Sequence, residues 1–144
     1  MTPRDHSFHA VAFEENLNLR EIATNFPEAK LSAHHLRIAV DSPGDTFVFP
    51  FGAIVFHDAG PERREAALAT LHRARPGLTT QVVHEEYTVR EDATVGRVGF
   101  DTNGTLVVDK MTHGRANVIA LTVAQSAAKA TRVTGVNYDK LVED

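Results

Sequence analysis

The sequence contains no cysteine among its 144 residues. Without cysteine, a disulfide framework, a thiol nucleophile and a cysteine-bound zinc or iron–sulfur cluster are all excluded. Basic residues are not in excess either, since the formal net charge is -4 and the pI is about 6.0. A protein that is built mainly to hold nucleic acid usually presents a basic face. We therefore expect no nucleic-acid partner. The absence of cysteine also leads us to expect a cytoplasmic location, because the cytoplasm is reducing.

Long apolar runs are also missing from the chain. The apolar run FVFPFGAIVF at residues 47–56 is interrupted by Pro50 and Gly52, and it falls well short of the ~20 residues that cross a bilayer. The N-terminus has no continuous apolar stretch of the kind found in secretion signals. We therefore expect no membrane span, and we interpret residues 47–56 as two short buried strands, or one bent strand, at the centre of the core.

Length and apolar patterning together predict a single α+β domain over residues 1–144. Alternating or β-branched stretches indicate strands at residues 7–13, 32–40, 79–90, 95–100 and 105–108, in addition to the central run. Apolar residues at helical spacing predict helices over residues 18–26, 58–76 and 115–132, with Gly135 ending the last one. This order favours a mostly antiparallel sheet of about five to seven strands and about three helices, which lie largely on one face.

The predicted third helix is apolar over more than half of its circumference. Val118 and Leu121 lie on one helical stripe, and Ile119, Val123 and Ala127 widen it. One face of a sheet does not readily cover such a helix, so we expect it to be shared between the core and an interface. The residues expected at that interface are Val118, Leu121, Val123, Gln125, Ser126 and Ala127. Gln125 and Ser126 would either set the register between helices or serve in capping or in contact with solvent.

Several short segments resemble the YagE-like family of bacterial proteins and their eukaryotic relatives named for being required for meiotic nuclear division. These segments are FVF and FGAIVF within residues 47–56, HEEY at residues 84–87, the hairpin leading to residues 109–110, and ALTVAQS at residues 120–126. Matches in this order cover roughly residues 8–126. The resemblance implies an organising or anchoring role, and it carries over no catalytic residue.

The chain departs from that family's pattern after the Ala-Gln-Ser signature. The family generally continues with a leucine and then a glutamate, where this sequence has Lys129 and Val133. Family members usually extend into a long helical region that often ends in a membrane-anchoring segment. On this resemblance we expect the chain to be either a short stand-alone version or the folded core of a longer protein.

Eight histidines raise the question of a metal site. His34 and His35 are adjacent on a predicted strand, so their side chains are expected on opposite faces. His84 and Glu86 share a face, and His57 on a neighbouring strand would complete a set of ligands that zinc or iron accepts. This alternative predicts a small metal-assisted hydrolase.

A second alternative is a DNA-binding regulator. Residues 18–40 imitate a helix-turn-helix, in which the second helix would bring polar side chains to base edges. Pro27 and the β-branched residues near position 40 argue against that second helix.

Sequence signals for catalysis are weak. No serine lies in a Gly-x-Ser-x-Gly turn, and the adjacent acidic pairs lack an identifiable partner that would shift their pKa values. The leading hypothesis is therefore a non-enzymatic module without a cofactor, which associates with itself as a homo-oligomer or docks another protein.

Overall fold

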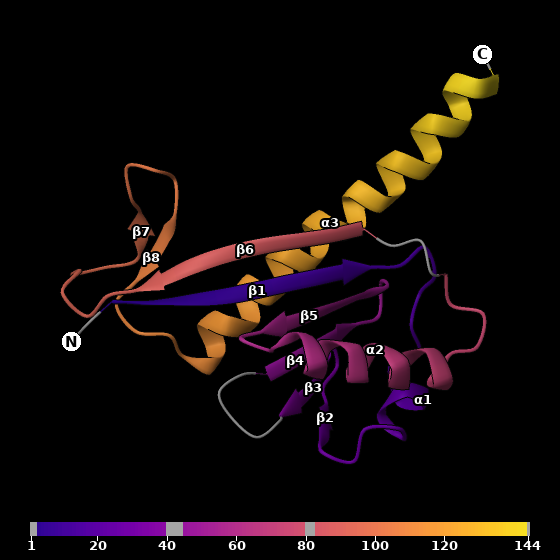
Figure 1. The fold of residues 1–144 in the computed structure, drawn as a ribbon, viewed down its shortest axis with the longest axis horizontal. Helices are drawn as coiled ribbons and strands as arrows, with labels where there is room; N and C mark the ends of the chain where they lie inside the picture. Colours follow the sequence, from indigo (N-terminus) through magenta and orange to yellow (C-terminus); the bar gives the residue numbers. More distant parts are fainter. Residues whose placement is uncertain (1–2, 40–44, 80–82, 144) are drawn as a thin grey trace.

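The computed structural model describes residues 3–39, 45–79 and 83–143, and for residues 131–143 it describes the backbone alone. Within these ranges the chain forms one eight-stranded sheet in the order β2-β3-β4-β5-β1-β6-β8-β7 (Figure 1). The strands are β1 (Arg4–Ala12), β2 (Ala29–Leu31), β3 (Leu36–Ala39), β4 (Asp45–Phe49), β5 (Ala53–His57), β6 (Val83–Glu91), β7 (Gly99–Phe100) and β8 (Leu106–Val108). The helices are α1 (Leu19–Ala23), α2 (Pro61–Ala74) and α3 (His113–Glu143).

The sheet is mostly antiparallel, which confirms the predicted α+β class. Among the described strands, β6 and β8 form the one parallel pair. The strand number exceeds the expected five to seven, because the segment interpreted as one strand over residues 32–40 is preceded by β2, which pairs with β3 through a tight turn.

Helices cover both faces of the sheet, so the prediction that they lie largely on one face is wrong. Successive side chains of β1 point to opposite faces of the sheet, and apolar residues occur on both faces, so each face must pack against its own helices. Phe8 and Ala10 lie in the core cluster that includes α3, and Val11 lies in the cluster that includes α1 and α2. The molecule therefore has three layers, with α3 on one side of the sheet and α1 and α2 on the other (Figure 1).

The central apolar run forms a hairpin in the middle of the sheet, as expected. Phe47 and Phe49 on β4 and Phe56 on β5 are almost completely buried. The turn between the strands depends on Gly52, whose φ of +103° lies in the region that favours glycine. Gly52 also accepts a hydrogen bond from the Phe13 amide at 2.7 Å, which ties the turn to the end of β1.

The two shorter helices begin at recognisable start signals, a capping side chain in α1 and a first-turn proline in α2. The side chain of Asn18 accepts hydrogen bonds from the amides of Arg20 and Glu21 at the start of α1. Pro61 occupies the first turn of α2, where the missing amide is harmless. Residues 29–39 form the β2–β3 hairpin rather than a second helix, so the helix-turn-helix interpretation is wrong.

The third helix is longer than predicted. It runs from His113 to Glu143 and passes through Gly135, which was expected to end it. A glycine inside a helix costs about 1 kcal/mol relative to alanine, which weakens a helix without stopping it. The last turns continue beyond the sheet (Figure 1). None of the helices, over the residues that are described, is long and apolar enough to traverse a bilayer.

Candidate functional sites: a groove beside α3 and a histidine–carboxylate cluster

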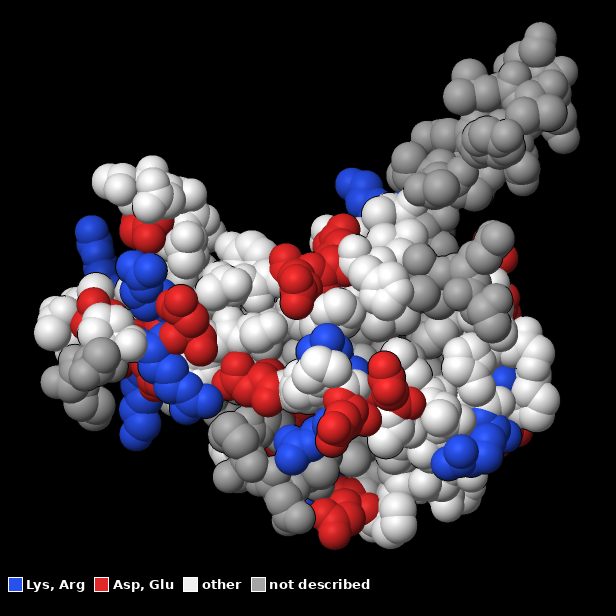
Figure 2. Space-filling view, viewed as in Figure 1, with Lys and Arg blue, Asp and Glu red and all other residues white. Residues whose placement is uncertain are grey.

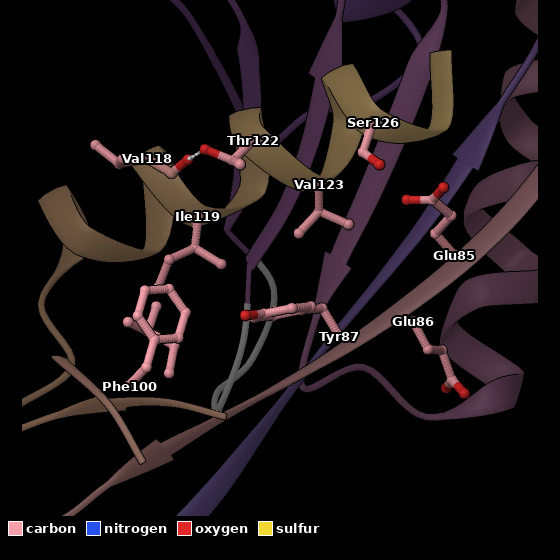
Figure 3. Close-up of a pocket in the computed structure, with 10 residues that line it drawn as sticks. Glu85, Glu86, Tyr87, Phe100, Val118, Ile119, Thr122, Val123 and Ser126 are labelled. Carbon is pink, nitrogen blue, oxygen red and sulfur yellow. Dashed lines mark hydrogen bonds between the residues drawn. The ribbon is translucent and has the colours of Figure 1, made fainter. Parts of the chain in front are cut away.

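An apolar groove lies between α3 and the strands β6, β7 and β8 (Figure 3). Its volume is about 340 Å³. Phe100 stands at one end with 71% of its surface exposed, and Val118 on α3 is 62% exposed. The lining residues are Glu85, Glu86, Tyr87, Phe100, Leu106, Val118, Ile119, Thr122, Val123 and Ser126.

The residues predicted for an interface divide between the exposed surface of α3 and the core. Val118, Leu121, Gln125 and Ser126 are exposed on α3. Val123 and Ala127 are buried against the sheet, in the same cluster as Phe8 and Phe47. Their proposed role in association stays a prediction, but α3 exposes the apolar side chains of Val118 and Leu121, which the described part of the chain leaves uncovered.

Charged side chains are mixed on the face that Figure 2 displays. Lys and Arg are interspersed with Asp and Glu on this view of the described residues, and they do not gather into one basic surface. The acidic balance of the whole chain agrees with this distribution. The face therefore lacks the electrostatic footprint that a nucleic-acid-binding surface requires.

A second site lies where β1 begins and where β5 and β6 end, at the left of the sheet in Figure 1. His6 and His57 are both buried here, and each side chain points to the α3 face of the sheet. His6 Nδ1 lies 2.9 Å from His57 Nε2 and 2.9 Å from Asp58 Oδ2, and the latter two atoms are 3.3 Å apart. The ring of His57 stacks on Phe8 with a centroid distance of 4.4 Å, which holds it in place.

The other nitrogen of His6 has a carboxylate partner. His6 Nε2 lies 3.0 Å from Glu91 Oε1 at the end of β6. Glu91 Oε2 accepts a hydrogen bond from the amide of Met111, just before α3. This backbone bond, followed by the bond to His6, lowers the pKa of Glu91. Glu91 is therefore a fixed anion that orients the imidazole of His6. We call His6, His57, Asp58 and Glu91 the histidine–carboxylate cluster.

Asp58 reaches the cluster through an unusual backbone conformation. Its φ of +56° is the one positive value for a non-glycine residue in the described part of the chain, and such values mark strained positions. Burial would raise the pKa of Asp58, but hydrogen bonds from His57 and the Ser7 amide, with the attraction of both imidazoles, lower it to about 2. The group is therefore a carboxylate at neutral pH. Arg4 Nη2 donates to the same Oδ2 atom at 3.1 Å.

The metal-ligand set predicted from the sequence is not brought together. His57 pairs with Phe8 in the register of the sheet, and it faces α3. His84 pairs with Val11, so it faces the α2 side. Glu86 lies 3.4 Å from His9 Nδ1 on that same side, and His84 Nδ1 lies 3.1 Å from His9 Nε2. The sheet itself separates His57 from the other two, so the proposed three-residue site is wrong.

The adjacent pair His34 and His35 also lies in a different element from the one predicted. His34 and His35 lie in the turn between β2 and β3 rather than on a strand. The backbone of this turn is closed by a hydrogen bond from the Ser32 amide to the His35 carbonyl at 2.9 Å. In the described part of the chain they have no third ligand, and the cluster of His6, His57 and Asp58 is the one group that the geometry brings together.

Sequence reasoning identified His57 but missed His6 and Asp58. One signal for His6 was available. His6 and Phe8 are two residues apart on β1, so their side chains lie on the same face of the sheet, and the apolar Phe8 marks that face as buried. Nothing in the sequence revealed that β1 lies between β5 and β6, and this order is what brings the two imidazoles together. No protein-family model matches the chain, and no curated protein is significantly similar to it.

Proposed function

We propose that the chain is a self-association module, in which the groove beside α3 and its apolar rim are covered by the same surface of a second copy. One observation carries this proposal. Phe100 on β7 and Val118 on α3 line the groove and expose 71% and 62% of their surfaces, and Leu121, which is 38% exposed, lies on α3, the helix whose apolar excess the sequence indicates. Apolar surface gathered around a hollow is typical of interaction sites.

A second copy fits this surface because the projecting side chain of Phe100 and the groove lie on the same face of the molecule. In a twofold interface each patch meets an identical patch, so a projecting side chain beside a groove provides both halves of the contact. Phe100 projects at one end of the groove, and the α3 side chains line its wall (Figure 3). Gln125 and Ser126 are exposed on the same helix, where they are available for hydrogen bonds between copies.

The length of α3 also supports association between copies. The helix continues past the sheet as far as Glu143, without strands beneath its last turns (Figure 1). An unsupported helical segment of about 12 residues is marginally stable in water. Packing against a second helix would stabilise it. The resemblance to the YagE-like family implies an organising role, which agrees with a module of this kind.

The exposed apolar side chains allow an estimate of the dissociation constant of the dimer, and the charges allow an estimate of its salt dependence. Burying three such side chains on each copy contributes roughly 5–10 kcal/mol, which is comparable with the cost of association. The low end of that cost leaves at most about 6 kcal/mol, so we expect a weak dimer with a dissociation constant between about 50 μM and about 1 mM. Both copies carry a net charge of -4 and an acidic residue, Glu85, at the groove. Added salt should therefore strengthen self-association by screening repulsion.

Sedimentation velocity over that concentration range tests the proposal. The parent chain should form dimers, and Val118→Asp or Leu121→Asp should keep it monomeric by placing a charge in the interface. Leu31→Asp is the matched control, because Leu31 is also exposed, at 47%, but lies on β2 at the other end of the sheet. Its sedimentation should equal that of the parent.

Three results would contradict a second copy as the occupant. One is a strict monomer at the highest concentration with salt present. Another is a dimer that Val118→Asp and Leu31→Asp affect equally. The third is a groove that binds only a basic amphipathic peptide, with an affinity that falls as salt is added, since that identifies a different partner.

A further inference from the structure

We propose that the histidine–carboxylate cluster binds one divalent first-row transition-metal ion, held by His6 Nδ1, His57 Nε2 and Asp58 Oδ2. These atoms come from the start of β1 and from the end of β5, so residues separated by about fifty positions meet at one point. The site lies at the end of the sheet, and it shares no residue with the groove beside α3.

The distances between the three atoms match the ligand shell of a small ion. The triangle has edges of 2.9, 2.9 and 3.3 Å. An ion about 2.0–2.1 Å from each ligand separates neighbouring ligands by about 2.9 Å in an octahedral shell and by about 3.3 Å in a tetrahedral one. The side chains therefore already stand at the spacing that a bound ion imposes.

One neutral tautomer of His6 has a single N–H and so does not satisfy both of the carboxylates that contact its ring nitrogens. Asp58 is a carboxylate and can only accept. If the ring proton of a neutral His6 lies on Nε2, where Glu91 accepts it, then Nδ1 presents a lone pair to Asp58 at 2.9 Å. Two facing lone pairs repel each other. A cation held between the ligands removes this repulsion.

Glu91 provides the outer partner that metal-bound histidines usually have. Such a histidine almost always donates its remaining N–H to a carboxylate or carbonyl, which fixes the tautomer and the ring orientation. The contact of His6 Nε2 with Glu91, itself held by the Met111 amide at 2.6 Å, has this arrangement. The free nitrogen of His6 is thereby directed at the site.

The ligand chemistry selects the class of ion. Two imidazole nitrogens and one carboxylate oxygen suit Zn²⁺, Fe²⁺, Co²⁺ or Ni²⁺, whereas Mg²⁺ and Ca²⁺ prefer oxygen ligands alone. Three protein ligands leave at least one position for water or a small molecule. Arg4, which is half exposed, donates to the same Asp58 oxygen and repels a cation there. Removing its charge should therefore tighten binding.

Metal titration of the full chain, prepared without a histidine tag and stripped by a chelator, tests the proposal. Zn²⁺ should bind with a stoichiometry of one per chain in competition with a chromophoric chelator, and it should raise the Tm. Co²⁺ should give the visible absorption of a site with nitrogen and oxygen ligands. Asp58→Asn keeps the shape of the side chain and should weaken Zn²⁺ binding by at least about 100-fold. Glu91→Gln should weaken it about 10-fold or more.

His84→Gln is the matched control, because it removes an imidazole from the opposite face of the sheet and should leave Zn²⁺ affinity unchanged. Arg4→Met should raise the affinity, a result that an ion-pair cluster without metal does not produce. The proposal is overturned if the parent chain takes up no stoichiometric Zn²⁺ or Co²⁺. It is equally overturned if folded Asp58→Asn, checked by circular dichroism, binds Zn²⁺ as the parent does.

Discussion

Gly52→Ala should destabilise the fold by about 3 kcal/mol, and the structure separates that cost into two parts. The first part is backbone strain. Gly52 has a φ of +103°, a conformation that costs a residue with a Cβ atom about 1–2 kcal/mol. The total loss of about 3 kcal/mol is a large fraction of the 5–15 kcal/mol that stabilises a typical domain, but it leaves most molecules folded.

The second part is a steric clash. A Cβ atom on Gly52 would lie 2.3 Å from the carbonyl oxygen of Glu15, far inside any real contact. That backbone cannot easily move away, because the Glu15 side chain accepts the Thr79 amide at 2.8 Å and the Leu17 amide donates to Pro50 at 2.9 Å. Forcing extra atoms into a packed region costs about 1–3 kcal/mol.

Urea unfolding of three alanine variants measures the two parts separately. Gly77 has a φ of +88° but no neighbour within 4 Å of its Cβ position, so Gly77→Ala reports strain alone. Gly114 lies in the first turn of α3 with open space around it, so Gly114→Ala should be neutral or stabilise by up to about 1 kcal/mol. If Gly52→Ala costs no more than Gly77→Ala, the inferred clash and the rigidity of the Glu15 segment are both refuted.

Two further predictions concern the α2 side of the sheet. Leu71→Ala should lower the free energy of unfolding by about 2–5 kcal/mol, because Leu71 is the one fully buried residue of α2. Urea unfolding measures this loss, and an equal loss in Leu68→Ala, where the side chain is only half-buried, would contradict the reasoning. Burial lowers the pKa of His9, with Arg64 and His84 adding to the effect and Glu86 opposing it. The unfolded chain therefore binds a proton first as the pH falls through about 6.5, and stability drops. The urea midpoint should decrease from about pH 7.5 to about pH 5.5, and His9→Gln should reduce that decrease; an unchanged slope would refute the role of His9.

The sequence was sufficient to predict the α+β class and the central hairpin, because both depend on local signals. Phe47, Phe49 and Phe56 belong to a run too short to span a bilayer, and Pro50 and Gly52 mark the turn within it. The helix start signals, the cap Asn18 and the first-turn residue Pro61, are equally local. Which face each helix covers depends on strand order, and strand order is a property of the whole chain.

The histidine–carboxylate cluster shows where local rules fail. Alternation along a strand places neighbouring side chains on opposite faces, and this rule would have separated His57 from Asp58. The positive φ of Asp58 turns its carboxylate back toward the imidazole. His6 arrives from β1 through a register that no local pattern encodes. The end of α3 was mispredicted for a simpler reason, since one glycine was treated as a stop.

The two outermost strands of the sheet restrict how copies of this chain can polymerise. The sheet begins with β2, which has three residues, and ends with β7, which has two. A long exposed strand would offer its unpaired amides and carbonyls as a template for another chain, whereas such brief margins offer almost none. Backbone pairing with another chain is therefore disfavoured at β2 and β7, whereas residues 83–88 of β6, which β8 does not pair, keep an open edge where such pairing remains available.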